Sequence, residues 1–472
     1  MIELTLAEVA AATGGRLAGA DPAARVTGPV EYDSRRVAPG GLFVAFVGER
    51  VDGHEFAESA MAAGAVAVLG TRPRAEVPMV LVEDPLAALA KLARAVLDRL
   101  PELTVIGVTG SSGKTTTKDY LAQLTGRLGA TVAPVGSLNN ELGAPYTALQ
   151  VDRQTRYLVV EMGARGLGHV AHLCRAVPPT IGVVLNVGVA HLGEFGSVAA
   201  IAQAKGELVE ALPPAGRAVL NVDDPAVAAM AARTRAVVVG YGESAGAEVR
   251  ATDVTLDERG RPRYTLVTPE GSAPVRLAVP GAHQVSNTLA VAAVGRALGR
   301  PPPELAATLG ELRPASERRM DVFDRPDGVT VIDDSYNANP ASTAAALRAL
   351  TAIGRGRRTI AVLGYLAELG EYEQAGHEEV GALAAELGVH RLVVVGAAAA
   401  GIHHGACGQQ RWGGESVLVA DQDAAVAWLR EELRPGDVVL VKGSRYRTWE
   451  VADWLRDRSG AVAAEPVREP RP

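Results

Sequence analysis

The chain has 472 residues, enough for about three domains of ordinary size, each with its own hydrophobic core. Its 47 basic and 54 acidic residues give a net charge of −7, without the basic balance that is typical of nucleic-acid-binding proteins. No apolar run approaches the ~20 residues that a membrane-spanning helix needs. Composition therefore favours a globular protein without the sequence signature of a nucleic-acid-binding or membrane-spanning protein.

The two cysteines and the first residues predict a cellular compartment. Cys174 and Cys407 lie far apart in the sequence and have no metal-binding spacing. The N-terminal segment MIELTLAEVAAATGG contains acidic residues and lacks the basic and apolar regions of a signal peptide. We therefore expect a reduced, cytoplasmic protein.

Residues 1–100 are predicted to form a small α/β domain. Short strands around turn residues are indicated in VTGPVEYDSRRVAPGGLFVAFVG, and DGHEFAESAMAAGAVAVLG indicates a helix that leads into an apolar strand. The polar segment 33–36 contains Ser34 and Arg35, which could donate hydrogen bonds to an anionic ligand. A solvated turn is the alternative interpretation of this segment.

Residues 101–314 alternate apolar strands with helices, which is typical of a mainly parallel sheet with crossover helices. Between residues 248 and 280 the pattern changes to alternating segments bounded by Gly and Pro, which predicts a small antiparallel appendage. A helix and a proline-rich linker follow, and a boundary is expected near Pro314. Residues 315–472 are predicted to form a third α/β unit, and the final AAEPVREPRP is predicted to be disordered.

The segment TVIGVTGSSGKTTTKDY, residues 104–120, has the pattern of a phosphate-binding loop between a strand and a helix. A loop of small residues lets backbone N–H groups approach phosphate oxygens, and the helix N-terminus adds its dipole. Lys114 is placed to reach the terminal phosphates, and the Thr115 hydroxyl to bind Mg²⁺. The strict pattern has glycine where this chain has Val108, so the motif departs from the common form.

Two polar residues follow neighbouring strands of the same predicted sheet. Glu161 ends the apolar strand in YLVVEMG, and His191 follows the strand TIGVVLNVG. Both are therefore expected at the carboxyl edge of the sheet beside Lys114. Glu161 is a candidate Mg²⁺ ligand, because Mg²⁺ prefers hard oxygen atoms. The alternative is a carboxylate that caps a nearby helix.

Lysine is rare in this chain: the five lysines are Lys91, Lys114, Lys118, Lys205 and Lys442. A lysine that survives such a bias is a candidate for chemistry that arginine cannot perform, because arginine stays charged and is not an amine nucleophile. Lys205 lies on an amphipathic segment, IAQAKGELVEAL. It is either an exposed lysine paired with Glu207 or Glu210, or a desolvated amine with a lowered pKa.

Asparagine is also rare, with seven residues in the chain, and adjacent Asn139 and Asn140 lie in SLNNELGAP. Their amides could bind the hydroxyls and amides of a substrate, and an Asn-rich turn is the alternative. In the third unit, DDSYNANPAS follows an apolar strand and indicates a ligand loop, a helix N-cap or both. Lys442 and Arg445 in VKGSR are suited to a carboxylate or phosphate.

Together these motifs resemble the Mur ligase family over essentially the whole chain. The resemblance rests on DSRRVAPGGLFVAFVGERVDGHEF, GVTGSSGKTT, SLNNELGAP, VVEMGA, NVGVAHLGEFGS, AKGE, DDSYNANP, AELG and VKGS. The family's loop is T-G-x-x-G-K-[ST], which accounts for Val108. Within the family, the chain is most similar to the ligases that add D-alanyl-D-alanine to a UDP-N-acetylmuramoyl-tripeptide.

The resemblance implies a UDP-binding N-terminal domain, a central ATPase and a C-terminal Rossmann-like domain. It also implies ATP and two Mg²⁺ ions, phosphorylation of the tripeptide carboxylate to an acyl phosphate, and attack by the dipeptide amine. UDP-MurNAc-tripeptide and D-Ala-D-Ala are then the substrates. A monomer without nucleic-acid or membrane partners is expected.

The family's functional residues transfer to matching positions in this chain. The metal site is assigned to Thr115, Glu161, His191 and Lys205, and Lys205 is expected to be carbamylated. Lys114, His191 and Lys205 are assigned to catalysis. The ATP contacts are Gly110, Ser111, Ser112, Gly113, Lys114, Thr115, Thr116, Asn287, Arg319, Asp334 and Asn337. The substrate contacts are Ser34, Arg35, Asn139, Asn140, Lys442 and Arg445.

Four positions depart from the family pattern, namely Ser137, Ala282, Gln284 and Tyr365, and none of them is a residue assigned to the chemistry. Two other functions stay open. The first is the sister ligase that adds the third stem amino acid, although its D-N-P-R motif is absent here. The second is a regulatory protein that hydrolyses ATP without forming a bond.

Overall fold

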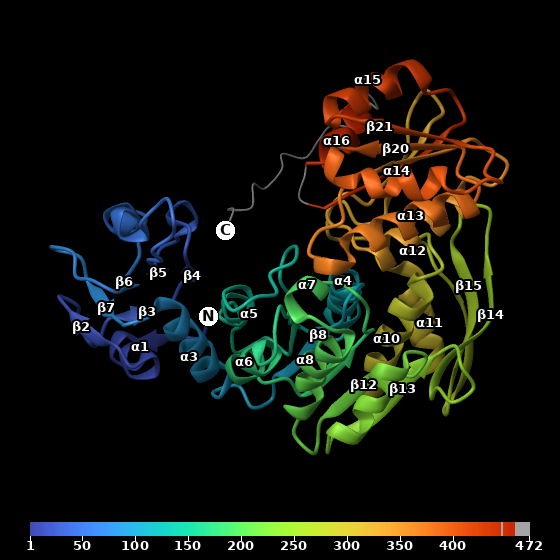
Figure 1. Cartoon of the computed structure of the whole chain (residues 1–472). Coiled ribbons are helices and arrows are strands. Elements are labelled where there is room, and N and C mark those ends of the chain that lie inside the picture. The colour runs from blue at the N-terminus through green and yellow to red at the C-terminus, as the bar shows by residue number, and fades with distance from the viewer. Residues whose placement is uncertain (445–446, 458–472) are drawn as a thin grey trace.

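The computed structural model describes residues 1–444 and 447–457, which form three α/β domains (Figure 1). The predicted disordered end of the chain and Arg445 lie outside the described residues. No helix in the described part of the chain is long and apolar enough to cross a membrane. The three domains are built around separate sheets, as the alternating strand and helix patterns predict.

The N-terminal domain has a five-stranded sheet in the order β2-β7-β6-β5-β4, parallel except for the β2–β7 pair. Its strands are β2 (Arg16–Ala18), β4 (Val30–Glu31), β5 (Leu42–Val44), β6 (Ala67–Gly70) and β7 (Met79–Leu81). A separate antiparallel pair joins β1 (Leu4–Thr5) and β3 (Arg25–Val26). The helices are α1 (Leu6–Thr13), α2 (Ala57–Ala62) and α3 (Pro85–Leu97), with 3-10 turns η1 (Ser34–Arg36) and η2 (Gly53–Phe56).

The central domain has a nine-stranded sheet in the order β16-β15-β14-β13-β12-β11-β8-β10-β9. Its strands are β8 (Thr104–Thr109), β9 (Thr131–Val132), β10 (Tyr157–Glu161), β11 (Ile181–Val184), β12 (Arg217–Asn221), β13 (Val237–Gly242), β14 (Val249–Leu256), β15 (Pro262–Thr268) and β16 (Gly271–Arg276). The helices are α4 (Lys114–Gly126), α5 (Gly143–Ala148), α6 (His169–Ala176), α7 (Leu192–Phe195), α8 (Val198–Glu210), α9 (Pro225–Ala228), α10 (Gln284–Ala297) and α11 (Pro302–Glu311), with the 3-10 turn η3 (Ala229–Arg233).

The antiparallel segment was predicted as an appendage, and its place in the fold differs from that expectation. Strands β14, β15 and β16 are antiparallel to one another, but β14 also pairs in parallel with β13 and continues the central sheet. Two residue pairs, Tyr241 with Val249 and Gly242 with Arg250, make this connection. The backbone of β13 would otherwise be an unpaired edge, so the hairpins extend the sheet.

The C-terminal domain has a six-stranded sheet in the order β17-β18-β22-β19-β20-β21, parallel except for β17. Its strands are β17 (Asp321–Asp324), β18 (Thr330–Asp333), β19 (Thr359–Leu363), β20 (Arg391–Val395), β21 (Glu415–Val419) and β22 (Val438–Lys442). The helices are α12 (Pro340–Ile353), α13 (Glu373–Glu386), α14 (Ala400–Cys407), α15 (Gln422–Glu432) and α16 (Trp449–Asp457), with 3-10 turns η4 (Gly370–Tyr372) and η5 (Ala397–Ala399).

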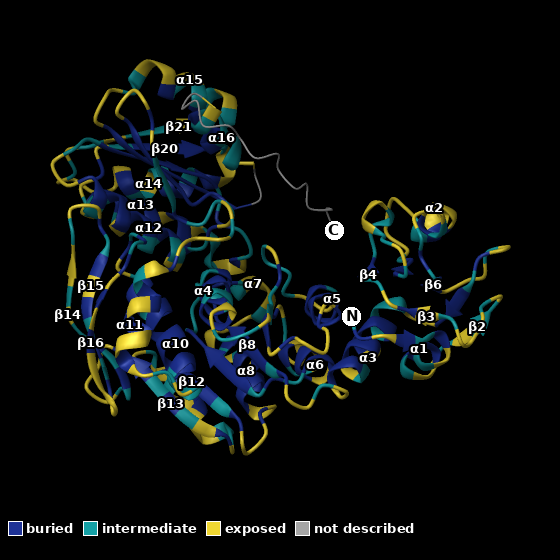
Figure 2. Ribbon diagram, turned by 180° about the vertical axis from the view of Figure 1, so that it is seen from behind, coloured by how far each residue is buried: buried dark blue, intermediate teal, exposed yellow. Residues whose placement is uncertain are grey.

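The inner parallel strands of the central and C-terminal domains are largely buried (Figure 2), whereas the edge strand β21 is not. Strands β10 and β22 are buried at every position, as expected for parallel strands covered by helices on both faces. The N-terminal domain lies beside the central one and reaches it through α3, which packs against α5 and α6 (Figure 1). The C-terminal domain lies over the end of the central domain where α4 begins (Figure 1).

A buried carboxylate joins the N-terminal and central domains. Glu31, at the end of β4, is 7% exposed, and the Tyr146 hydroxyl of α5 donates to its two oxygens at 3.1 and 3.0 Å. The Tyr146 ring packs edge-on against Tyr32, with 5.0 Å between the ring centroids. Burial raises the pKa of Glu31, although the hydrogen bond from Tyr146 acts in the opposite direction.

This raised pKa predicts a stability change with pH. Unfolded Glu31 ionises near its ordinary pKa of 4.5, whereas the folded protein retains the proton to higher pH. The Glu31 contribution is therefore fully present below pH 4.5 and is lost as the pH rises through the raised folded pKa. Glu31→Gln should be more stable relative to wild type at pH 7 than at pH 4, measured as melting temperature.

Glu3→Gln is the matched control, because Glu3 forms an exposed pair with Arg25 in the same domain. Its melting temperature relative to wild type should change little between the two pH values. An equal offset for Glu31→Gln at both pH values would contradict the raised pKa.

Candidate functional site

The predicted phosphate loop connects β8 to α4 and is held by the segment that follows β11. The Ser111 N–H donates to the Asn186 carbonyl at 3.1 Å, and the Ser112 N–H donates to the Asn186 side chain at 2.9 Å. Gly113 has φ +82°, and a Cβ there would lie 2.7 Å from the Asn287 side-chain oxygen. Glycine is therefore required at this position, both for the backbone conformation and for the space.

Lys114 occupies the first turn of α4, and its ammonium donates to the Gly110 carbonyl at 2.8 Å. Burial lowers the pKa of Lys114; Glu161 raises it and Arg319 lowers it further. The side chain thus curls back over the loop, in the position expected of a lysine that contacts phosphates. Thr116 is partly buried in the same turn.

Glu161 is the centre of a compact polar cluster at the carboxyl end of β10. It is 1% exposed, and the Thr115 hydroxyl donates to one of its oxygens at 2.8 Å. The Asn139 amide and the Ser137 hydroxyl donate to the other oxygen at 2.6 and 3.1 Å. Glu161 does not act as a helix cap in these contacts, and its oxygens with the Thr115 hydroxyl form the hard donor set that Mg²⁺ prefers.

Lys205 lies in the interior of α8 and is 3% exposed. Burial lowers the pKa of Lys205 well below its ordinary value, and nearby Lys114 lowers it further. The alternative of an exposed ion pair is wrong. Glu207 accepts hydrogen bonds from the N-terminal turn of α6, and Glu210 pairs with Arg233. No carboxylate in the described part of the chain forms an ion pair with Lys205.

His191 immediately precedes α7 and contacts the C-terminal domain. Its Nδ1 lies in close contact with the carboxylate of Glu368, and the Gly193 N–H donates to the Glu368 carbonyl at 3.2 Å. Both His191 and Glu368 have positive φ, at 63° and 65°. Among the described residues no hydrogen bond or ion pair joins His191 to Thr115 or Glu161, so the expected four-residue metal site is not assembled by direct contacts.

A complete protein cage for a metal ion is also absent from the described residues, where no three His, Cys, Asp or Glu side chains gather at binding distance. Mg²⁺ commonly uses one or two carboxylates and completes its shell with water and phosphate oxygens. The Glu161 cluster fits that requirement with the Thr115 hydroxyl and one carboxylate. The residues present therefore suit a cation that is shared with a bound nucleotide.

Two further predicted nucleotide contacts lie near the loop. Asn287, on α10, is buried beside Gly113, and its amide nitrogen donates to Gln284 at 3.0 Å. Arg319 stacks its guanidinium over the Tyr336 ring at 4.1 Å. The Arg319 Nε is buried without a hydrogen-bond partner, although the guanidinium lies close enough to Lys114 to affect its pKa. A buried cationic donor without a partner is suited to an anionic ligand.

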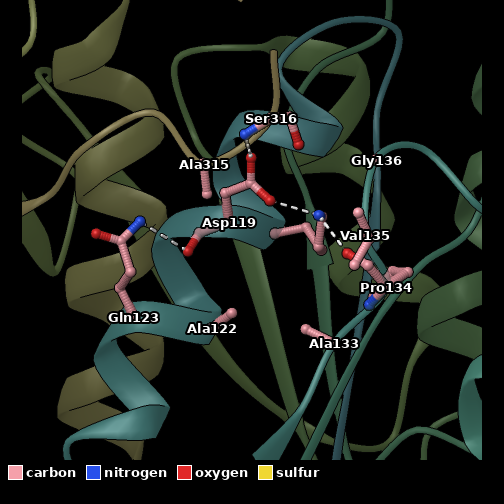
Figure 3. A pocket seen from close by; sticks show the side chains of 10 residues that line it. Asp119, Ala122, Gln123, Ala133, Pro134, Val135, Gly136, Ala315 and Ser316 are labelled. Atoms are coloured by element: carbon pink, nitrogen blue, oxygen red, sulfur yellow. Dashed lines mark hydrogen bonds and ion pairs between the residues drawn. The ribbon is translucent and has the colours of Figure 1, made fainter. Parts of the chain in front are cut away.

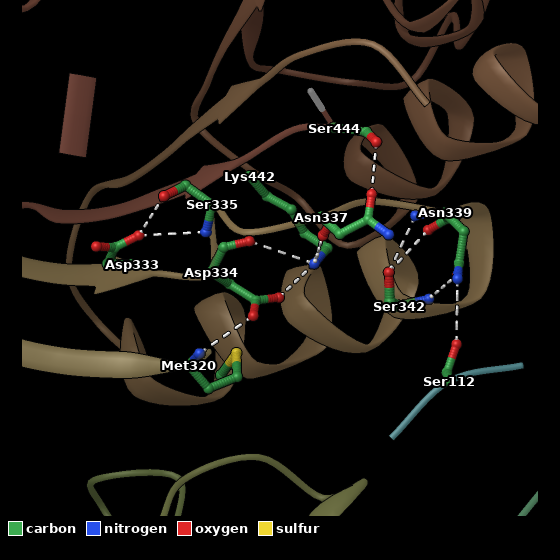
Figure 4. Close-up of polar contacts among 10 residues, drawn as sticks. All are labelled: Ser112, Met320, Asp333, Asp334, Ser335, Asn337, Asn339, Ser342, Lys442 and Ser444. Atoms are coloured by element: carbon green, nitrogen blue, oxygen red, sulfur yellow. Dashed lines mark hydrogen bonds and ion pairs between the residues drawn. The ribbon is translucent and has the colours of Figure 1, made fainter. Parts of the chain in front are cut away.

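The DDSYNANP segment forms a second network (Figure 4). Lys442, at the end of β22, is 2% exposed and pairs with the Asp334 carboxylate. Its ammonium also donates to the Asn337 carbonyl at 2.9 Å, and the Asn337 side chain accepts from Ser444. Lys442 is thus engaged inside the C-terminal domain, which differs from the expectation of a lysine available to substrate.

Asn339 links this network to the phosphate loop. Its side chain caps α12 by accepting from the Ser342 N–H at 2.9 Å, which confirms the N-cap interpretation of the segment. The same side chain lies 3.3 to 3.4 Å from the Ser112 hydroxyl, across the boundary between two domains (Figure 4). The loop and the C-terminal domain therefore meet directly.

The predicted substrate contacts are distributed over two domains. Ser34 and Arg35 lie on η1 of the N-terminal domain, where the Arg35 guanidinium donates to Asp33. Asn139 contacts Glu161 in the central domain, whereas the Asn140 side chain accepts from the Gly143 N–H, at the first residue of α5, at 2.8 Å. The structure does not bring these two pairs together by contacts among the described residues.

Two residues that depart from the family pattern take structural roles at the site. Ser137 donates to Glu161, as described above. Gln284 accepts from Tyr120 at 3.3 Å and from Asn287, which holds the asparagine beside the phosphate loop. The Tyr365 hydroxyl donates to Glu373 at 2.5 Å.

Sequence reasoning missed Glu368 and Asn339 as contacts across the domain boundary. Both lie inside motifs that the resemblance uses, AELG and DDSYNANP, so the motifs indicated their importance. Their partners, His191 and Ser112, are distant in sequence, and no local pattern indicates such pairs.

A phosphate loop at the carboxyl edge of a parallel sheet, facing a second α/β domain, defines a nucleotide-binding enzyme. Three family models match the chain: the Mur ligase family catalytic domain over residues 29–96, the Mur ligase middle domain over 108–295, and the Mur ligase glutamate ligase domain over 318–445. The chain belongs to the Mur ligase family, as the sequence motifs predicted.

Individual relatives span almost the whole chain. The UDP-N-acetylmuramoyl-tripeptide–D-alanyl-D-alanine ligase of Mycobacterium bovis is 51% identical, over 94% of this chain and 96% of its own length. A crystal structure of MurF from Acinetobacter baumannii is 31% identical, with TM-score 0.87 over 97% of this chain and 99% of that one. MurF from Thermotoga maritima in complex with ADP is 31% identical, with TM-score 0.80, over 93% and 99% of the two chains.

The Glu161 cluster predicts a cation-binding defect. Glu161→Gln keeps an oxygen that can accept from Thr115 but removes the negative charge. In the presence of ADP, we expect the variant to bind Mn²⁺ about 100-fold more weakly than wild type, as measured by electron paramagnetic resonance titration. Glu194→Gln, on the exposed α7, is the matched control. Equal Mn²⁺ affinity in Glu161→Gln and wild type would remove Glu161 from the cation site.

Proposed function

We propose that this protein uses ATP to ligate D-alanyl-D-alanine to UDP-N-acetylmuramoyl-tripeptide in peptidoglycan precursor synthesis. The observation that carries the proposal is the phosphate loop, which has the Glu161 cluster at its side and contacts the C-terminal domain. That contact joins Ser112 of the loop to Asn339. The relative that is 51% identical over nearly the whole chain is named as a UDP-N-acetylmuramoyl-tripeptide–D-alanyl-D-alanine ligase, which is the proposed activity. Amide-bond formation driven by ATP needs phosphate and amine sites that face each other, and a loop between two domains provides such a position.

We infer that the three domains divide the work. Residues 1–100 bind the UDP-sugar peptide, residues 101–314 bind ATP, and residues 315–472 complete the ligase site. Ser34, Arg35, Asn139 and Asn140 are the proposed contacts to the UDP-sugar peptide. Lys442 acts mainly by holding Asp334 and Asn337, which are proposed nucleotide contacts together with Asn287 and Arg319. Arg445 keeps its proposed substrate role and lies outside the described residues.

In the proposed reaction, the γ-phosphoryl group passes to the terminal carboxylate of the tripeptide and gives an acyl phosphate. The dipeptide amine then attacks the acyl carbon, and phosphate leaves. The loop of residues 110–116 binds the phosphates, and Lys114 neutralises charge that develops on the transferring group. Arg319 adds a second cation from the C-terminal side, close to Lys114.

We propose that Thr115 and Glu161 hold Mg²⁺, with a second ion in reach of a carbamylated Lys205 and His191. A bound Mg²⁺ would polarise the phosphoryl oxygens and offset their negative charge. The hydroxyl and carboxylate oxygens present suit this ion, as the Glu161 cluster indicates. Contact with Glu368 orients the His191 ring, which leaves Nε2 as the ring nitrogen available to a ligand.

The environment of Lys205 supports the proposed carbamylation. A neutral amine attacks CO₂ and loses a proton, which gives a carbamate with two oxygen ligands. Because burial and Lys114 lower the pKa of Lys205, the neutral amine is populated at lower pH than in an exposed lysine. The carbamate would also replace a repulsive neighbour of Lys114 with an attractive one.

A cytoplasmic location is part of the proposal, because the proposed substrates are small soluble molecules, and a monomer is proposed as well. The sister ligase would use the same ATP chemistry with a single amino acid as the amine. The D-N-P-R motif of that enzyme is absent from the sequence, which favours the dipeptide. A regulatory ATPase would need neither amine nor UDP-tripeptide.

Phosphate release separates these functions. With ATP and Mg²⁺, we expect release to rise at least about 100-fold when UDP-tripeptide and D-Ala-D-Ala are both added, because phosphoryl transfer requires a positioned carboxylate. Omitting either substrate should return the rate to the background. Equally fast release without them would sink the ligase proposal, and activation by a single stem amino acid instead of the dipeptide would favour the sister ligase.

Lys205 gives an independent prediction. In ¹³C-bicarbonate, wild type should show a carbamate carbon resonance that Lys205→Arg lacks, and Lys205→Arg should lose activity by about 100-fold or more. The fold should survive, as judged by circular dichroism. Lys91→Arg is the matched control, because Lys91 lies on α3, away from the proposed site. An identical ¹³C spectrum for Lys205→Arg and wild type would exclude the carbamate.

A further inference from the structure

The linker between the central and C-terminal domains is bound by side chains of α4, the helix that begins at the phosphate loop (Figure 3). The Asp119 carboxylate accepts from the Ser316 N–H at 3.0 Å. The Gln123 amide donates to the Arg313 carbonyl at 2.9 Å and accepts from the Arg313 N–H at 3.1 Å. Two residues of one helix thus make three hydrogen bonds to linker backbone.

The Asp119 carboxylate is itself held by a buried ion pair. Lys118 is 1% exposed, and its ammonium pairs with Asp119 and donates to the Pro134 carbonyl at 2.7 Å. Pro134 precedes the loop that carries Ser137 and Asn139 to Glu161. A buried ammonium that has both partners is strongly oriented, so Asp119 presents a fixed acceptor to the linker.

The linker is not fixed by close packing on the side where it meets α4. A cavity of about 300 Å³ opens there and is lined by Asp119, Gln123, Ala315 and Ser316, among others (Figure 3). Val135, on its rim, is 86% exposed. Apolar packing against this part of the linker is incomplete, so the hydrogen bonds from α4 are the main contacts that hold it in place.

Beyond Ser316 the linker turns sharply and presents Arg319. The flanking residues Arg318 and Met320 both have left-handed backbone, with φ 58° and 53°. The Met320 N–H donates to the Asp334 carboxylate at 3.1 Å, and the Tyr336 N–H donates to the Arg318 carbonyl at 3.2 Å. Such strained residues persist only where the surroundings fix them, and here they fix the turn that carries Arg319, whose charge lowers the pKa of Lys114.

We propose that Asp119 and Gln123 are positioning residues that fix the linker to α4 and thereby hold Arg319 at the nucleotide phosphates. Helix α4 carries Lys114 in its first turn and Asp119 about 7.5 Å farther along its axis. One rigid helix therefore determines the position of Lys114 directly and that of Arg319 through the linker. The inference rests on the proposed function insofar as the phosphates are those of ATP. The inference also assigns a role to Lys118, one of the five lysines of the chain, which orients the Asp119 carboxylate.

Gln123 is the residue to test, because replacing Asp119 would leave a buried ammonium unpaired and destabilise α4 itself. Gln123 is only partly buried, and Gln123→Ala should fold normally. We expect it to lower kcat/KM for ATP about tenfold while KM for UDP-tripeptide changes less than about twofold. A general loss of structure would not separate the two substrates in this way.

A double-mutant cycle with Arg319→Ala decides whether Gln123 acts through Arg319. If it does, Gln123→Ala should change kcat/KM for ATP less than about twofold in the Arg319→Ala background. Arg127→Ala is the matched control, because its exposed pair with Glu311 joins the end of α4 to α11 without touching the linker. That variant should behave like wild type.

The four proteins of the cycle, namely wild type, the two single variants and the double variant, are also titrated with the non-hydrolysable ATP analogue AMP-PNP. The cycle then does not depend on ligase turnover. Absence of ligase activity in wild type, with the expected coupling in AMP-PNP affinity, would refute the proposed function and leave the linker inference standing. Independent effects of Gln123→Ala and Arg319→Ala, or wild-type behaviour of Gln123→Ala in both assays, would overturn the inference.

Discussion

The buried carboxylate of Glu161 is the interaction on which the arrangement of the site depends. Its three donors come from two segments, Thr115 from the first turn of α4 and Ser137 with Asn139 from the loop before α5. Removing a carboxylate from water is costly unless hydrogen bonds and nearby cations compensate. Glu161 therefore fixes the position of α4 relative to the sheet edge and, with it, the phosphate loop that α4 begins.

The positive charge near this carboxylate exceeds what Glu161 alone can balance, which suits a ligand with several negative charges. Burial lowers the pKa of both Lys114 and Lys205. Arg319 lowers the pKa of Lys114 further, and Lys114 lowers that of Lys205 further. Three bound phosphates would supply the missing negative charge and favour the charged form of Lys114. A carbamate on Lys205 would remove one of the repulsive contacts, so the two proposed changes act in the same electrostatic direction.

The sequence predicted the parts of the fold and site that are local. Apolar runs such as YLVVE became buried parallel strands, and a contiguous motif placed Lys114 and Thr115 at a helix N-terminus. Glu161 followed from the rule that strand ends share one sheet edge. The contact of His191 with Glu368 and the place of β14 beside β13 were not predictable, because the docking of distant surfaces determines them. Lys442 was assigned to substrate for a related reason, since its partner Asp334 is remote in sequence.

Division of the site among domains has a chemical consequence on the proposed function. An acyl phosphate is open to attack by water as well as by an amine, so the enzyme gains from assembling a dry site only around bound substrates. The phosphate loop already contacts the C-terminal domain through Ser112 and Asn339, whereas Ser34 and Arg35 lie on a domain attached through α3 and the Glu31–Tyr146 contact. On the proposed function, contacts between the central and C-terminal domains can therefore hold ATP before the N-terminal domain brings the tripeptide carboxylate that receives the γ-phosphoryl group.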